Sequence, residues 1–349
     1  MKTLRAYILP RFQIHVSAFK QLTSRILSTE RVLPQNLDDL ELFGLREDPY
    51  ISESMILNET KRASEDPIAK LVLESTYWEP DRDCAFDRFL KSRDFNTTLA
   101  LLQGWGVQET DSIVEIGAGS GFLAWALHRS GFQDLSILEP NSNWVTGTGY
   151  LRSRADATNL KIENSIAAWY ENPIRYEHVL TRNCIHHFPN MTWIAACIRG
   201  KLKANSNWFV IREPFVDSSR EWYRFMQSHP FSQKYKIFEF ACPSSHYINA
   251  IELAGFRLKA VVPANFENNC LSQYSEIAGS KWNQRQSAIL TWLLGKHPKL
   301  SVAAYRIETS LPSSIRNWLR WFTRPQVLWF QRVEMGELPK HTLWYSRDM

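Results

Sequence analysis

The sequence lacks the patterns that would place it in a disulfide-rich, zinc-binding or membrane-spanning class. Its 349 residues include only five cysteines, none closer than thirteen positions to the next: Cys84, Cys184, Cys197, Cys242 and Cys270. This spacing suggests neither a zinc knuckle nor a disulfide framework. No stretch approaches the roughly 20 consecutive apolar residues of a membrane span, and the N-terminus lacks the apolar block of a secretory signal. We expect a cytoplasmic protein.

Acidic residues are missing from the N-terminus. Residues 1–29 contain five basic residues and no acidic one, a composition that organelle transit peptides share. Organelle targeting is therefore the alternative location. Because Phe12, Ile14, Val16 and Phe19 are typical of an ordinary packed element, we favour a basic surface segment of the mature fold.

The overall composition is ordinary, but the charge is unevenly distributed. Hydrophobic residues at 44% and charged residues at 22% are typical of a globular protein of one large core or two modest ones. The net charge is +5, yet residues 281–333 hold nine basic residues against Glu308 alone, a net charge of +8. Any contact with anionic lipid or with an anionic substrate is expected in this segment.

Helical spacing begins between Cys84 and Trp105. Two apolar sets follow each other there, and on one straight helix they would face opposite sides: Phe86, Phe89 and Leu90, then Phe95, Leu99 and Leu102. Either one helix is buried on both faces, or the helix breaks near Arg93.

From there to Pro263, buried-type strands alternate with helical segments. The strand segments are "SIVEIG", "LSILEP", "LKIEN", "HVLTRNCIHHF", "NWFVIREP" and "FRLKAVVP", and the helical ones include "GFLAWALHRSG" and "NWVTGTGYLRSRADA". This alternation predicts an α/β fold with a doubly wound, mostly parallel sheet and helices on both faces. We assign 85–265 to this core and 1–84 to a mixed or helical N-terminal extension.

The segment "VEIGAGSGFL", residues 114–123, places three glycines directly after a strand and before a helix. Such a turn exposes backbone N–H groups at the positive end of the helix, where side chains would block a ligand. Gly119, Gly121 and Ala124 satisfy a dinucleotide fingerprint, with Glu139 placed for the ribose. A nicotinamide cofactor is thus one interpretation.

The same segment resembles the first motif of class I S-adenosylmethionine-dependent methyltransferases, in which an acidic residue stands two positions before alternating glycines. "LSILEP", "NCIHHFPN", "LKANSNWFVIREP" and "AIELAGFRLKAVVP" resemble later segments of that family in the same order, over about 150 residues. The resemblance implies S-adenosylmethionine as cofactor, with Glu139 binding the ribose hydroxyls. The residues it places around the cofactor are Glu115, Gly117, Ala118, Gly119, Gly121, Glu139, Pro140, Asn164, Ser165 and Asn183.

One position departs from the family pattern. The family usually offers an acidic residue after the third strand to read the adenine amine, whereas Asn164 or Ser165 stands there in this chain. A neutral acceptor can still accept a hydrogen bond from the amine.

The resemblance also implies a seventh strand, antiparallel beside the sixth. We predict this strand in "TLWYSRD", within residues 339–349, which would complete a seven-stranded sheet. Residues 266–338 would then be a basic, tryptophan-rich helical insertion between the sixth and seventh strands. The alternative is a separate helical appendage with a disordered tail.

Three residues are candidates for chemistry. His186 and His187 follow the fourth strand, on the side where open α/β sheets bind ligands, and one of them could take a proton from the acceptor. Glu213 follows the fifth strand and would point toward the same rim. These residues and His246 have no compact metal-binding spacing, so we predict no metal.

The long segment from Val216 to Ser245 is expected to cover the acceptor. Its aromatic residues and the histidine that follows are the candidates for a substrate wall: Trp222, Tyr223, Phe225, Met226 and His246.

The sequence thus favours S-adenosylmethionine-dependent methyl transfer to an oxygen or carbon of a small molecule. A NAD(P)-dependent oxidoreductase and a catalytically inactive methyltransferase-like binding or assembly module are the alternatives. Nucleic acid is not favoured, because neither a known nucleic-acid-binding motif nor an "NPPY"-type motif is present. The sequence does not indicate the oligomeric state.

Overall fold

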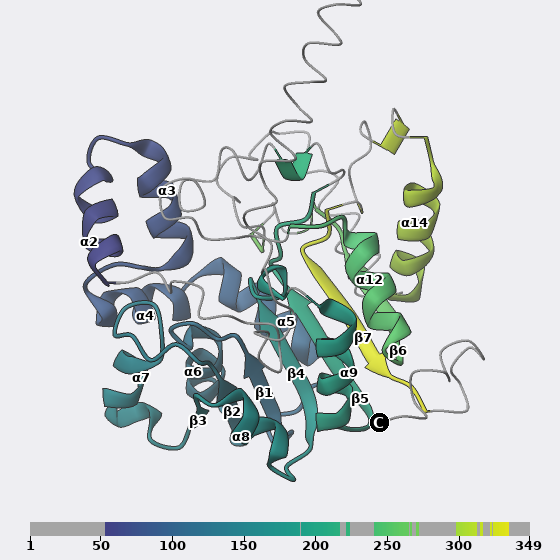
Figure 1. Cartoon of the computed structure of the whole chain (residues 1–349), viewed down its shortest axis with the longest axis horizontal. Helices are drawn as coiled ribbons and strands as arrows, with labels where there is room; N and C mark the ends of the chain where they lie inside the picture. Colours follow the sequence, from purple (N-terminus) through teal and green to yellow (C-terminus); the bar gives the residue numbers. More distant parts are fainter. Residues whose placement is uncertain are drawn as a thin grey trace, which may run out of the picture. The chain divides into compact units, whose positions relative to one another are not determined.

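A seven-stranded mixed sheet organises the chain (Figure 1). The computed structural model describes residues 53–188, 190–216, 221–223, 241–264, 266, 270–271, 298–312, 315–316, 322 and 324–334. All of them belong to one unit, Glu47–Met349. None of the helices in these ranges combines the length and the apolar character needed to cross a membrane.

The strand order is β3-β2-β1-β4-β5-β7-β6. The strands are β1 Ile113–Ile116, β2 Leu135–Leu138, β3 Lys161–Glu163, β4 Tyr176–Arg182, β5 Leu202–Ile211, β6 Phe256–Val262 and β7 Val327–Arg332. Neighbours from β3 to β5 pair in parallel, whereas β7 pairs antiparallel with both β5 and β6. Every residue of β1 and β2 is buried, as expected for parallel strands covered on both faces. The predicted fold class is confirmed.

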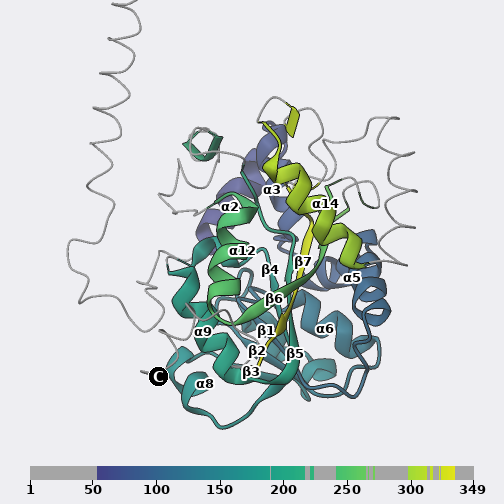
Figure 2. The same cartoon turned by 90° about the vertical axis from the view of Figure 1, so that its right-hand side faces the viewer.

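Helices cover both faces of the sheet. Figure 2 shows α9 and α12 on one face and α5 and α6 on the other. The helices are α2 Glu53–Arg62, α3 Pro67–Thr76, α4 Arg82–Leu90, α5 Arg93–Gly104, α6 Phe122–Arg129, α7 Gly149–Ser153, α8 Ile166–Glu171, α9 Met191–Lys201, α12 Ser244–Leu253 and α14 Pro298–Ser310, with short 3-10 turns η3 Ala155–Ala157 and η4 Ile185–His187. The helices α2 and α3, which the sequence analysis assigned to an N-terminal extension, belong to the same unit as the sheet.

The apolar stretch from Cys84 to Trp105 forms two helices, so the second of the two expectations is correct. Ser92 separates them: its side chain accepts a hydrogen bond from the Phe95 N–H at 3.0 Å and caps α5. Each helix then turns its own aromatic side chains inward, Phe86 and Phe89 from α4 and Phe95 from α5, all essentially buried.

The predicted helix over "NWVTGTGYLRSRADA" is mostly wrong. Only Gly149–Ser153 is α-helical; the 3-10 turn η3 follows it, and the chain before it forms a loop. A Cβ at Gly147 would lie 2.3 Å from the Asn141 carbonyl oxygen, and one at Gly149 would lie 2.6 Å from that of Ser142. These glycines permit close backbone contacts within the loop, which a regular helix would not make.

The seventh strand is not where the sequence analysis placed it. β7 is Val327–Arg332, inside the range 266–338 assigned to the insertion, and "TLWYSRD" lies outside the described residues. Residues 263–326, with α14, therefore connect β6 to β7. Helix α14 lies beside β6, where the Val261 N–H donates to Ser301 Oγ at 2.9 Å. This hydrogen bond satisfies a backbone donor on the strand that ends the sheet.

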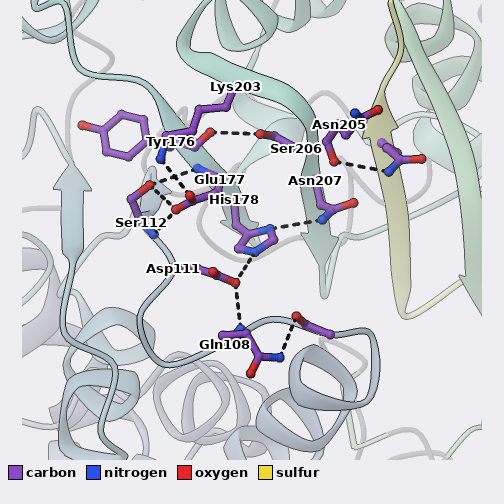
Figure 3. Close-up of polar contacts among 12 residues, drawn as sticks. Gln108, Asp111, Ser112, Tyr176, Glu177, His178, Lys203, Asn205, Ser206 and Asn207 are labelled. Atoms are coloured by element: carbon purple, nitrogen blue, oxygen red, sulfur yellow. Dashed lines mark hydrogen bonds and ion pairs between the residues drawn. The ribbon is translucent and has the colours of Figure 1, made fainter.

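A network of polar side chains fastens the amino ends of the parallel strands (Figure 3). Ser112, just before β1, donates its N–H and its hydroxyl to Glu177 Oε2 on β4, both at 2.6 Å. The other oxygen of Glu177 pairs with Lys203 Nζ on β5 at 2.7 Å. Burial acts to raise the pKa of Glu177, but Lys203 and Ser112 lower it to about 2. This carboxylate therefore stays charged and joins three strands.

A second set of contacts crosses the same edge. His178 on β4 lies 2.9 Å from Asp111 through Nε2, and its Nδ1 lies 3.2 Å from the amide nitrogen of Asn207 on β5. Asn207 Oδ1 accepts from the Trp329 indole on β7 at 2.9 Å. Burial lowers the pKa of His178. The neutral imidazole thus links the loop before β1 to β4 and β5 (Figure 3), and Asn207 extends these contacts to β7.

Candidate functional site

The three glycines after β1 have different neighbours. Gly117, Gly119 and Gly121 all have left-handed backbones, with φ of 66°, 55° and 76°. A Cβ at Gly117 would lie 2.0 Å from Cys184 Sγ, and one at Gly121 would lie 2.5 Å from Leu151 Cδ2. At Gly119 the one heavy atom of the described residues within 4 Å would be the Thr146 carbonyl oxygen, at 3.5 Å. Packing by the protein's own side chains thus explains two glycines, and Gly119 is the one that leaves room for a ligand. Ala118, between them, is partly buried.

The Glu115 side chain stabilises this turn by capping helix α6. Gly121 is the N-cap of α6 and has no side chain to cap it, so Glu115 Oε2 accepts the N–H of Ala124 at 2.8 Å instead. The side chain is 3% exposed, and burial raises its pKa to about 7. The contact satisfies one of the amides left free at a helix start and holds α6 against β1.

Glu139 joins the tip of β2 to the glycine turn. Its Oε2 accepts the Gly119 N–H at 2.6 Å, and its Oε1 accepts the Asn141 N–H at 2.8 Å. Burial raises the pKa of this carboxyl to about 7. Each oxygen of an ionised carboxylate has a further lone pair, so the group can accept more hydrogen bonds in this position. Pro140 follows it and is partly exposed.

Asn164 and Ser165 make hydrogen bonds within the chain. The amide nitrogen of Asn164 donates to the Glu139 carbonyl and to Thr148 Oγ1, and its oxygen accepts from Arg152. Ser165 is exposed and caps α8 by accepting the N–H of Ala168 at 3.1 Å. Both residues therefore have structural roles beside the predicted adenine position.

Asn183 has an acceptor that nothing in the described chain uses. It follows β4 directly with a φ of 52°, and its N–H donates to the Ile211 carbonyl at 2.9 Å. Its side-chain oxygen is buried and has no hydrogen-bond partner. A buried acceptor of this kind is costly unless a ligand or water supplies a donor.

His186 and Glu213 form a buried pair. His186 Nδ1 lies 2.7 Å from Glu213 Oε2, and both side chains are at most 1% exposed. The other oxygen of Glu213 accepts the N–H groups of Cys184 and Ile185 at 2.8 and 3.1 Å. Glu213 therefore anchors the turn η4 and orients the His186 ring. The ring of His187 lies 4.1 Å from that of His186, centroid to centroid, and its side chain is partly exposed.

The structure describes three of the five residues of the predicted substrate wall. Trp222 and Tyr223 lie in a short half-buried stretch, 221–223, whereas Phe225 and Met226 lie outside the described residues. His246 is exposed in the first turn of α12, where its N–H donates to the Pro243 carbonyl at 2.9 Å. In the described ranges no three His, Cys, Asp or Glu side chains come together as a set that could hold a metal ion.

Cys184 packs under Gly117 in the site, although it was not among the predicted site residues. Burial raises the pKa of its thiol well above the ordinary value, and three nearby carboxylates add to the rise: Glu213, Glu139 and Glu115. The strand pattern gave no sign that a cysteine after β4 would pack under a glycine after β1. It also gave no sign of the buried cluster formed by Asp94, Arg182 and Arg212 beside this edge.

Comparison with known proteins yields matches of fold. No family model and no curated protein sequence matches this chain. Solved structures do match it. A magnesium protoporphyrin IX methyltransferase from Synechocystis PCC 6803 with bound SAH is 10% identical with a TM-score of 0.44, covering 82% of this chain and 97% of that one. The YcgJ protein from Bacillus subtilis is 10% identical with a TM-score of 0.42, covering 68% and 99%. The mitomycin 7-O-methyltransferase MmcR is 15% identical with a TM-score of 0.39, covering 60% and 68%.

The sheet itself identifies the fold. A doubly wound dinucleotide-binding sheet has the order 3-2-1-4-5-6, whereas this chain inserts an antiparallel β7 between β5 and β6. Such a strand is the feature that the sequence analysis expected from the methyltransferase resemblance. The chain therefore has an α/β Rossmann-like fold with an antiparallel seventh strand of the kind that the methyltransferase resemblance implied.

Proposed function

We propose that this protein is an S-adenosylmethionine-dependent methyltransferase that acts on a small-molecule acceptor. The observation that carries the proposal is the carboxyl edge of the sheet, where ligands bind in open α/β folds. Glu139, the open position at Gly119 and the unpartnered oxygen of Asn183 come together there from β2, the turn after β1 and the end of β4.

The residues present fit this cofactor. Glu139 would accept from the ribose hydroxyls, Gly119 would let the ligand approach the backbone, and Asn183 Oδ1 would accept from an amino group of the cofactor. When bound, S-adenosylmethionine supplies a methyl group on a positively charged sulfur.

The charge of the site favours a cationic ligand over a dinucleotide. Three buried carboxylates adjoin Cys184, and the two arginines at this edge are paired with Asp94. A positive ligand would stabilise the ionised forms of Glu115 and Glu139, whose pKa values are raised to about 7. The pyrophosphate of NAD(P) would instead place negative charge beside them. This supports methyl transfer over an oxidoreductase.

The histidines suit an acceptor that must lose a proton. Glu213 holds His186 in a fixed orientation inside the protein, and the partly exposed His187 lies against it. We assign to His187 the removal of a proton from a hydroxyl or from an acidic carbon, because a proton acceptor must reach the substrate. His186 and Glu213 would then set its position.

The basic segment 281–333 remains a proposed contact for an anionic substrate or lipid. Within the described part of this segment, Arg324 is paired with Glu221, and Arg306 lies 3.8 Å from Glu252. These pairs reduce the positive charge that is available to a partner. They fit the small-molecule acceptor better than a polyanion.

Calorimetric titration tests the proposal. The protein should bind S-adenosylhomocysteine and not NADH, and Gly119→Val should abolish binding, because a side chain there enters the ligand space and strains a left-handed backbone. Gly104→Val is the matched control, since a Cβ at Gly104 would meet no heavy atom within 4 Å in the part of the chain that the structure describes. Circular dichroism should show that both variants fold.

NADH binding, or full binding by Gly119→Val, would show that the cofactor is assigned wrongly. Transfer of a labelled methyl group from S-adenosylmethionine to small-molecule acceptors then separates an enzyme from an inactive binding module. If the protein binds S-adenosylmethionine but transfers its methyl group to none of the acceptors tried, the inactive binding module is favoured.

A further inference from the structure

Two arginines at the carboxyl edge share one carboxylate. Arg182 is the last residue of β4, and Arg212 directly follows β5. Arg182 Nη2 lies 2.5 Å from Asp94 Oδ2, and Arg212 Nε lies 3.7 Å from the same oxygen. The side chain of Arg182 is 11% exposed, that of Arg212 is 6% exposed and that of Asp94 is 8% exposed. Asp94 is in the first turn of α5, so one residue from the helix layer holds the ends of two neighbouring strands.

The residues that follow these arginines belong to the proposed site. Asn183 comes directly after Arg182, and Glu213 comes directly after Arg212. The chain bends sharply at both places, since Asn183 and Arg212 have left-handed φ values of 52° and 63°. Backbone hydrogen bonds stabilise both bends: the Asn183 N–H donates to the Ile211 carbonyl, and the Arg212 N–H donates to the Gln326 carbonyl. Non-glycine residues hold such conformations when their surroundings determine them.

We propose that Asp94 is a positioning residue for the cofactor site. Its carboxylate holds Arg182 and Arg212, and through them it sets the unpartnered oxygen of Asn183 and the Glu213–His186 pair. The inference rests on the proposed function, because it concerns the same site.

Electrostatics explains why one acidic residue has this effect. Burial acts to lower the pKa of Arg182, but Asp94 raises it above the ordinary value, so the guanidinium stays charged. Without Asp94, two buried cations would remain at adjacent strand ends with no shared anion, and a buried charge without its partner forces the structure to rearrange. Arg212 also donates to the Ser75 carbonyl on α3 at 2.8 Å, so the rearrangement would extend to the N-terminal helices.

The amino edge of the sheet offers a matched control. Asp111 is likewise a carboxylate that binds a side chain of β4, through His178 at 2.9 Å, but it lies at the opposite end of the strand (Figure 3). Asp111→Asn should therefore lower stability without affecting the cofactor. Asp94→Asn should affect both.

The experiment measures S-adenosylhomocysteine affinity by calorimetry and thermal unfolding by circular dichroism for four full-length variants. We expect Asp94→Asn to weaken binding by at least about tenfold, Asp94→Glu to recover most of the affinity because it restores the charge, and Asp111→Asn to leave affinity within about twofold of the wild type. Arg212→Met keeps the Asp94–Arg182 pair and serves if Asp94→Asn does not fold. It should weaken binding by about threefold or more.

The inference is overturned if Asp94→Asn or Arg212→Met binds like the wild type. It is equally overturned if Asp111→Asn loses as much affinity as Asp94→Asn, since the effect would then follow stability alone. A wild-type protein that does not bind S-adenosylhomocysteine would instead refute the proposed function, and the inference with it.

Discussion

At the scale of single residues, the site depends on buried carboxylates whose charge is only partly stable at neutral pH. Glu139 is the clearest case, because burial raises its pKa to about 7 while two backbone amides contact its oxygens. Its ionised form is the one that accepts from a diol. Ligand binding and deprotonation of Glu139 should therefore favour each other.

This coupling predicts that affinity depends on pH. Because protonation of Glu139 competes with the ligand, S-adenosylhomocysteine should bind more weakly as the pH falls from about 8 to about 6, approaching a tenfold loss per pH unit well below the pKa. Glu139→Gln should bind weakly with a flat pH profile, as calorimetry at several pH values would reveal.

Glu163→Gln is the control for this prediction. Glu163 ends the neighbouring strand β3, where it accepts the Ser165 N–H at 2.7 Å, and its replacement should keep the wild-type pH profile. If Glu139→Gln retains the wild-type slope, another group, with Glu115 the first candidate, controls the pH dependence.

The residues of the site could be predicted only where a local pattern contains them. The glycines and Glu139 lie at strand ends that the sequence makes visible. Asp94 and Arg182 are 88 positions apart, and neither stands in a pattern. The packing of Gly117 against Cys184 likewise depends on how β1 and β4 are paired. Contacts between distant segments require the fold before they can be identified.

At the scale of elements, apolar content located strands well but did not distinguish two similar segments. "VLWFQR" and "TLWYSRD" both have the aromatic and apolar content of a strand, and the sequence analysis chose the second. The first is β7, and it pairs with β5 and β6 along its length. The side chains of β7 contribute to the core, since Val327, Leu328 and Phe330 are at most 2% exposed.

Because β7 lies between β5 and β6, the side chains that it buries should contribute strongly to stability. Phe330 is fully buried next to Trp208 of β5, so Phe330→Ala should lower the free energy of unfolding by about 3–5 kcal/mol through lost burial and a new cavity. Thermal or urea unfolding would measure it. Ile307→Ala is the control, because Ile307 on α14 is 64% exposed and should change stability little. Equal effects would mean that β7 does not contribute to the core.

At the scale of the whole described unit, the two edges of the sheet have different chemistry. The amino edge is fastened by Glu177, Lys203 and the neutral His178, whose partners are all supplied within the chain (Figure 3). The carboxyl edge has three left-handed glycines, two left-handed non-glycine residues and a buried acceptor without a partner. Left-handed glycines beside a buried acceptor without a hydrogen-bond partner are typical of a ligand site.

The fold was predictable from the alternation of strands and helices, because that alternation permits few topologies. The loop between β2 and α7 could not be predicted, because the close contacts of Gly147 and Gly149 with the backbone of Asn141 and Ser142 appear only in the fold. The acceptor likewise lacks a local signature, and two of the five predicted substrate-wall residues, Phe225 and Met226, lie outside the described residues.

We expect Glu139 and the turn at Gly119 to bind the adenosyl part of S-adenosylmethionine. A crystal structure of the protein with S-adenosylhomocysteine tests it most directly. We expect both ribose hydroxyls within hydrogen-bond distance of the Glu139 carboxylate, the ligand in contact with Gly119, and an amino group of the ligand hydrogen-bonded to Asn183 Oδ1. A ligand bound away from the carboxyl edge of the sheet, or with its ribose on other residues, would contradict it.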